Sequence, residues 1–166
     1  MNKSLNIPLE LDNLQGEEWK KYCLPCHETH GDCCKNLELT LFPDEIEHFK
    51  AKDKFSVSKY TLEVKTTRGE KKIVNFWGYN AKKCTFLLNN GLCELQVTGK
   101  QKPVDCLMYP INYKNQKLFL DTSCPANSLG NKEKALSILK SKLKQFPDYY
   151  YVSYDVMPED KDLGTF

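Results

Sequence analysis

Residues 23–34 read Cys-Leu-Pro-Cys-His-Glu-Thr-His-Gly-Asp-Cys-Cys, and they begin a set of eight cysteines in a chain of 166 residues. The stretch separates Cys23 from Cys26 by two residues and places Cys33 directly before Cys34. Two residues between cysteines let a single turn direct both sulfurs to one metal ion, at the bond length of about 2.3 Å that zinc prefers. Because proline, glycine and aspartate lie among them, the stretch predicts an irregular metal-binding loop.

The remaining four cysteines also occur in pairs. Cys84 and Cys93 flank Asn89-Asn90-Gly91, a turn sequence that predicts a β-hairpin of residues 84–88 and 92–97, with the two thiolates side by side. Cys106 and Cys124 each precede a proline at short range. We therefore expect all eight cysteines to be metal ligands: Cys23, Cys26, Cys33, Cys34, Cys84, Cys93, Cys106 and Cys124.

The number of metal centres stays open. Eight thiolates suffice for two four-coordinate sites, or four hold one centre while the others pack, take part in redox chemistry or complete the shell. Cys33 and Cys34 serve different centres if the backbone is extended, because neighbouring side chains then point to opposite faces, and can share one centre in a turn. His27 and His30 are alternative ligands within the first group.

Other roles for the cysteines fit less well. Residues 1–14 contain no apolar run long enough for a signal-peptide core, so we expect a cytoplasmic protein, and disulfides are rare in the cytoplasm. A thioredoxin-like Cys23/Cys26 pair would need a strand before it and a helix after it, and the sequence indicates neither. Single buried cysteines are common, whereas eight in paired spacing favour coordination.

Composition narrows the partners. The net charge is +2, Arg68 is the only arginine, and no segment approaches the ~20 apolar residues of a membrane helix. Arginine is the usual reader of guanine edges and phosphates, so we expect neither a nucleic-acid nor a membrane partner. A metal ion or cluster remains, together with a protein partner or substrate.

Outside the cysteines, residue patterns predict short strands and a few helices. Leucines alternate with polar residues over 37–41, as in a half-buried strand, and Pro43 begins a short helix through Phe49. Further strands are expected at 62–64, 73–77 and 118–120, with turns at Arg68–Gly69 and Asn115–Gln116. His48 is expected on the surface. The clearest helix is 132–146, with an apolar stripe of Leu136, Leu139, Leu143 and Phe146.

These elements predict an α+β fold, a small single domain with short antiparallel strands and a few helices organised around a cysteine-ligated metal centre. Residues 1–20 are expected to form an N-terminal arm, with a short helix near 16–21. Residues 21–127 would form the metal-binding core, and residues 128–166 a C-terminal helix and tail packed on it. Residues 149–151 fit either a strand or a helix.

Several blocks together resemble the YkgJ-like cysteine-cluster family of zinc- or iron-chelating proteins. After the first group come Cys84-Thr-Phe-Leu, Gly91-Leu-Cys93, Pro103-Val-Asp-Cys106 and Cys124-Pro125, so the resemblance runs from Cys23 to about Pro125. In the block Pro103-Val-Asp-Cys106, the family has arginine directly after the cysteine and directly before the proline. This chain has Leu107 and Lys102 at those two positions. The resemblance implies metal chelation and leaves the roles of those arginines without a counterpart here.

The expected function is metal binding, through an iron–sulfur cluster or zinc, with a structural or electron-transfer role. Cys124-Pro125 favours iron–sulfur, and His27, in place of a glycine after the first pair, argues against a zinc knuckle. Similarity to flagellin lysine-N-methylases implies an alternative, a metal-dependent protein-modifying enzyme. It would need polar groups beside the metal, for which Asp105, Tyr109, His27 and His30 are the candidates. No glycine-rich loop for a nucleotide-like cofactor accompanies them.

Overall fold

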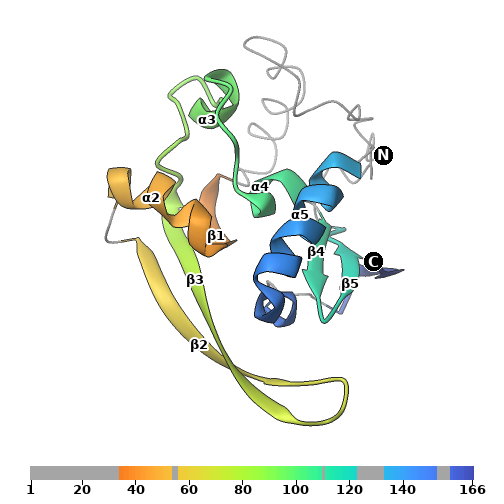
Figure 1. The fold of residues 1–166 in the computed structure, drawn as a ribbon. Helices are drawn as coiled ribbons and strands as arrows, with labels where there is room; N and C mark the ends of the chain where they lie inside the picture. The colour runs from red at the N-terminus through yellow and green to blue at the C-terminus, as the bar shows by residue number, and fades with distance from the viewer. Residues whose placement is uncertain (1–33, 54–55, 110, 123–132, 153–157) are drawn as a thin grey trace.

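The computed structural model describes residues 34–53, 56–109, 111–122, 133–152 and 158–166 (Figure 1). The predicted N-terminal arm and the short helix near 16–21 lie outside these residues. Within them the fold is mixed, with two small antiparallel three-stranded sheets and a few helices. This confirms the α+β fold class, while the metal centre around which the fold was expected to form belongs to the proposal below.

The first sheet contains β1 (Lys35–Leu41), β2 (Val57–Lys65) and β3 (Lys71–Lys83) in the order β1-β3-β2. The predicted strands are confirmed, and β2 and β3 are longer than their apolar residues indicated. Thr66 and Glu70 close the connecting turn by a backbone hydrogen bond of 2.7 Å. Gly69 occupies this turn with φ of +84°, a conformation that costs other residues more than glycine.

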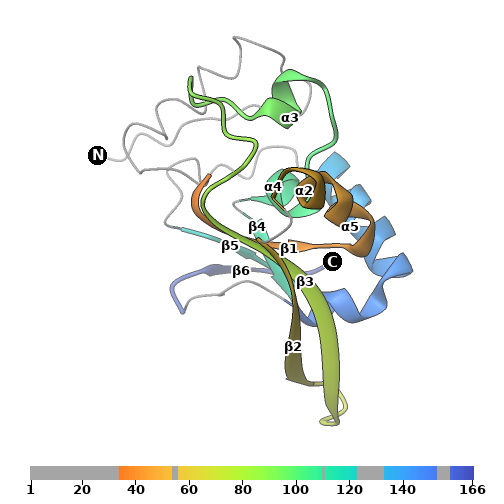
Figure 2. The ribbon, with the colours of Figure 1, turned by 90° about the vertical axis from the view of Figure 1, so that its left-hand side faces the viewer.

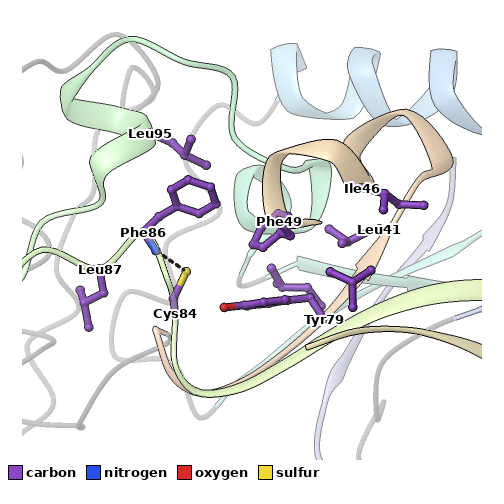
Figure 3. Packing of buried hydrophobic residues seen from close by; sticks show 10 residues of the cluster. Leu41, Ile46, Phe49, Tyr79, Cys84, Phe86, Leu87 and Leu95 are labelled. Atoms are coloured by element: carbon purple, nitrogen blue, oxygen red, sulfur yellow. Dashed lines mark hydrogen bonds between the residues drawn. The ribbon is translucent and has the colours of Figure 1, made fainter. Parts of the chain in front are cut away.

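Pro43 begins a short 3-10 helix, η3 (Pro43–Glu45), which continues into α2 (Ile46–Asp53), as predicted. His48 is exposed on α2, which is also as predicted. Ile46 and Phe49 point toward the sheet, and the Phe49 ring lies 4.4 Å from that of Tyr79 and 5.2 Å from that of Phe86, centroid to centroid (Figure 3). They belong to a first core cluster: Leu39, Leu41, Ile46, Phe49, Val57, Tyr79, Cys84, Phe86, Leu87 and Leu95.

The hairpin predicted for residues 84–88 and 92–97 is wrong: residues 84–88 form a turn rather than a strand, and the second half becomes helical. The predicted turn between the two halves forms, and Gly91 donates its N–H to the Leu88 carbonyl at 3.0 Å. Within this fully described segment, only Leu87 and Cys93 pair as a bridge, and the chain then enters the short helix α3 (Glu94–Val97). The reason is the spacing of the side chains to be buried: Leu92, Leu95 and Gln96 follow a helical period rather than strand alternation.

The second sheet contains β4 (Ile111–Lys114), β5 (Lys117–Leu120) and β6 (Lys161–Thr165), in that order. Asn115 and Gln116 both have positive φ, 49° and 65°, as a two-residue hairpin turn requires, so the predicted turn is confirmed. No sequence pattern predicted β6, in which a single leucine stands among charged and small residues.

The predicted long helix is α5 (Glu133–Gln145), which packs over the second sheet (Figures 1 and 2). Its leucine stripe meets the short helix α4 (Val104–Met108), which was not predicted, and η4 (Pro147–Tyr151). Residues 149–151 are therefore 3-10 helical. A second core cluster results: Phe42, Val104, Leu107, Met108, Ile111, Tyr113, Ala135, Leu139 and Tyr149.

Candidate metal centre

Four of the predicted ligands lie among the described residues, and each comes from a different segment. Cys34 directly precedes β1, Cys84 follows β3, Cys93 precedes α3, and Cys106 lies in α4. Outside the described residues lie the other predicted ligands: Cys23, Cys26, Cys33, Cys124, His27 and His30.

Sheet pairing brings the backbones of Cys34 and Cys84 together. β1 and β3 are antiparallel, and their register pairs Lys35 with Lys83. One residue further, the Cys84 N–H donates to the Cys34 carbonyl at 2.8 Å. The first sheet therefore carries one cysteine from each half of the sequence pattern to the same end.

The turn that follows β3 directs backbone N–H groups toward the sulfur of Cys84. Its Sγ accepts a hydrogen bond from the Phe86 N–H at 3.5 Å (Figure 3). Burial raises the pKa of the Cys84 thiol, whereas the N–H groups of Phe86 and Leu87 and the charge of Lys102 lower it. N–H groups directed at a sulfur stabilise a thiolate, and such hydrogen bonds tune the sulfurs of metal centres.

Long-range hydrogen bonds hold α4, and with it Cys106, in place. The Val104 N–H donates to Glu45 Oε1, and the Thr40 N–H donates to Asp105 Oδ2, each at 3.0 Å. Val104 faces the second core cluster, whereas Cys106 packs against the first. α4 thus joins the two clusters and places Cys106 at their boundary.

Cys93 lies close enough to Cys84 and Cys106 to influence both of their thiols, and Cys84 influences Cys106. Burial raises the pKa of the Cys106 thiol well above its usual value, Lys102 lowers it, and Asp105, Cys93 and Cys84 raise it further. Cys93 also raises the pKa of Cys84. Cys34, Cys93 and Cys106 all pack against the core cluster that contains Cys84, and none of the four forms a disulfide.

Thiols in this arrangement suit a thiophilic metal, because Cys sulfur is the preferred ligand of structural zinc and of iron–sulfur clusters. Still, among the residues that the structure describes, no three His, Cys, Asp or Glu side chains are grouped so that they could hold a metal ion. A four-coordinate centre would therefore require ligands from the other predicted cysteines.

The polar groups suggested for an enzyme site have structural contacts. Asp105 binds the Thr40 backbone, and the Tyr109 hydroxyl donates to Asp121 Oδ2 at 3.3 Å. Lys102, considered from the sequence only as a substitution for arginine, is the cation that lowers the pKa of both Cys84 and Cys106. The sequence signal for this role was the position of Lys102, four residues before Cys106.

Searches against protein-family models, curated proteins and solved structures find no match to this chain. The resemblance to the YkgJ-like family therefore stays a prediction. No described helix is both long enough and apolar enough to span a membrane.

Proposed function

We propose that this chain is a metal-binding protein in which cysteine thiolates hold zinc or an iron–sulfur cluster, with a structural or electron-transfer role. The observation that carries the proposal is that Cys84, Cys93 and Cys106, from three separate segments, pack in or against the same core cluster. There Cys93 raises the pKa of the Cys84 thiol, and Cys93 and Cys84 both raise that of Cys106. A shared metal ion would give thiols from separate segments a common partner, and its binding would contribute directly to folding.

The set of ligands extends beyond these three. Cys33 directly precedes Cys34 in the sequence, and Cys34 packs against the same core cluster as the other described cysteines. Cys23, Cys26 and Cys124 complete the eight that paired spacing assigns to metal. The Cys124-Pro125 sequence favours an iron–sulfur cluster over zinc, because a Cys-Pro ending occurs in bacterial ferredoxin-type motifs.

Metal content and absorbance test the proposal directly. Protein purified without oxygen should contain stoichiometric zinc, or iron with sulfide and a thiolate-to-iron absorption band, and Cys84→Ser, Cys93→Ser and Cys106→Ser should each reduce the content. Ser137→Cys, at an exposed position on α5, is the matched control. It adds a thiol away from the centre and should leave the stoichiometry unchanged. Metal-free protein whose eight thiols all react with a thiol reagent would refute the proposal.

Removal of the metal should also lower stability. A structural thiolate site contributes on the order of ~10 kcal/mol to folding, so strong chelation should lower the midpoint of thermal unfolding. If the chelated protein unfolds with the same midpoint and the same cooperativity, the two core clusters suffice and the metal has no structural role.

The enzyme alternative makes a different prediction. A metal-dependent methylase should bind S-adenosylmethionine, and calorimetry on the metal-loaded protein measures this. Saturable binding that is lost in Tyr109→Phe would favour the enzyme, whereas a reversible redox signal without such binding would favour electron transfer.

A further inference from the structure

The β2–β3 hairpin extends well beyond the rest of the fold in both views (Figures 1 and 2). β1 pairs with β3 only as far as Trp77, opposite Leu41, so residues 71–76 of β3 pair with β2 alone. We call residues 59–76 the arm, which is distinct from the N-terminal arm expected at residues 1–20. Val74 packs on Tyr151 and Val152, which holds one face of the arm to the body.

The outer edge of β2 is accessible along most of its length. β2 is the last strand in the order β1-β3-β2, and no described strand pairs with its outer side. Five consecutive residues, 59–63, are exposed. The edge strand of a sheet presents backbone N–H and C=O groups to which another extended chain can pair.

Apolar side chains are unusually exposed on the arm. Ile73 is 65% exposed, Leu62 38% and Tyr60 36%, and among the described residues Val97 is the only other large hydrophobic side chain in this exposed class. Leu62 lies within the outer strand, so a chain paired there could cover it.

The arm is also basic. It carries five cations against two carboxylates, a net charge of +3, while the whole chain has +2. Lys71 pairs with Glu63 at 2.9 Å, and Lys72 pairs with Asp148. The three other cations form no ion pair with any described residue: Lys59, Lys65 and Arg68.

We propose that the outer edge of β2 docks an extended acidic segment of a partner protein, which pairs with the edge as a further strand. Backbone pairing would supply affinity, Leu62 would contact an apolar side chain, and Lys59, Lys65 and Arg68 would contact carboxylates. The same cations oppose pairing of two copies of this chain, because like charges would then face each other. The turn at 66–70 contains no apolar residue, which favours a protein over a lipid bilayer.

A labelled peptide that alternates glutamate with valine and threonine is the first probe, and fluorescence anisotropy with the full chain at low salt measures its binding. Two matched peptides accompany it, one with a central proline that prevents strand pairing and one with lysine in place of glutamate. The glutamate peptide should bind, and both others should bind much more weakly. Equal binding of the proline peptide, or no binding of the glutamate peptide, would overturn the proposal.

Charge reversal localises the binding to the arm. A triple variant, Lys59→Glu, Lys65→Glu and Arg68→Glu, should weaken the glutamate peptide by about tenfold or more, since three attractive contacts become repulsive. Its control, Lys140→Glu with Lys144→Glu, reverses exposed charges on α5 and should change binding by less than about twofold. Similar effects in both variants would refute docking on the arm.

Hydrogen exchange identifies the mode of binding. Peptide pairing should slow exchange of backbone amides in residues 59–65, and unchanged exchange there would exclude strand addition. Vesicles of phosphatidylserine test the lipid alternative, and binding to vesicles without binding to the peptide would replace the protein partner by a membrane surface.

Discussion

Glu45 offers the sharpest test of how this fold is held together, because its carboxylate satisfies two buried backbone donors. Oε2 accepts the Phe42 N–H and Oε1 accepts the Val104 N–H, each at 3.0 Å. Phe42 and Val104 are both 1% exposed, so bulk water does not reach these two donors in the folded protein. We therefore expect Glu45→Ala to destabilise the protein and to loosen α4.

The magnitude follows from the two donors. A buried N–H without an acceptor costs ~1–3 kcal/mol, so two cost about 2–6 kcal/mol. Removing the carboxyl also removes its desolvation cost, the same burial that raises the pKa of Glu45. The expected loss is therefore about 2–4 kcal/mol. Glu45→Gln keeps one acceptor oxygen and should lose about half as much.

Urea unfolding followed by circular dichroism measures these free energies. Glu47→Ala is the matched control, because Glu47 is an exposed glutamate two residues further, paired with Lys50 at 3.7 Å. It should change stability by less than ~0.5 kcal/mol. If Glu45→Ala is as stable as Glu47→Ala, the buried bridge between η3 and α4 contributes nothing and the reasoning fails.

Three further predictions concern stability. Burial raises the pKa of Glu45 above 4.5, so the folded state retains a proton that the unfolded state releases. Stability should fall as pH rises from 4.5 through the raised pKa, and urea midpoints of Glu45→Gln should lack this slope. A Cβ on Gly78 would lie 2.6 Å from the Tyr60 ring, so Gly78→Ala should lower the free energy of unfolding by ~1 kcal/mol. A double-mutant cycle checks the cause, because the same substitution should cost less in a Tyr60→Ala background, where the ring is absent. Leu139→Ala, at a fully buried position, should cost ~2–5 kcal/mol, and exposed Lys140→Ala almost none, by thermal unfolding.

Elements with strong local signals could be predicted. Alternation of leucines with polar residues gives β1, the leucine stripe gives α5, and Asn115–Gln116 turns between β4 and β5. Each depends on residues within a few positions of one another, since strand and helix periods are local properties.

Elements without a local signal were missed or misassigned. α4 contains only five residues, and its position depends on Glu45, 59 residues before Val104. β6 pairs with β5 across about forty residues. Tyr149 could belong to a strand or a helix until stacking on Phe42, 4.9 Å between ring centroids, is known. In residues 92–97, a turn signal suggested a returning strand, but burial of Leu92 with Leu95 favours a helical turn.

The candidate site divides in the same way. Paired spacing alone singled out the cysteines, because metal ligands must lie a fixed number of residues apart to share a turn. Which thiols approach one another depends on tertiary contacts. The sheet register joins Cys34 to Cys84 through backbone, and the Thr40–Asp105 hydrogen bond, between residues 65 apart, holds α4 and Cys106 beside the first core cluster. The sequence therefore identifies which residues are candidate metal ligands. Which of their thiols lie close together is decided only by the folded chain, because no local pattern specifies contacts between distant segments.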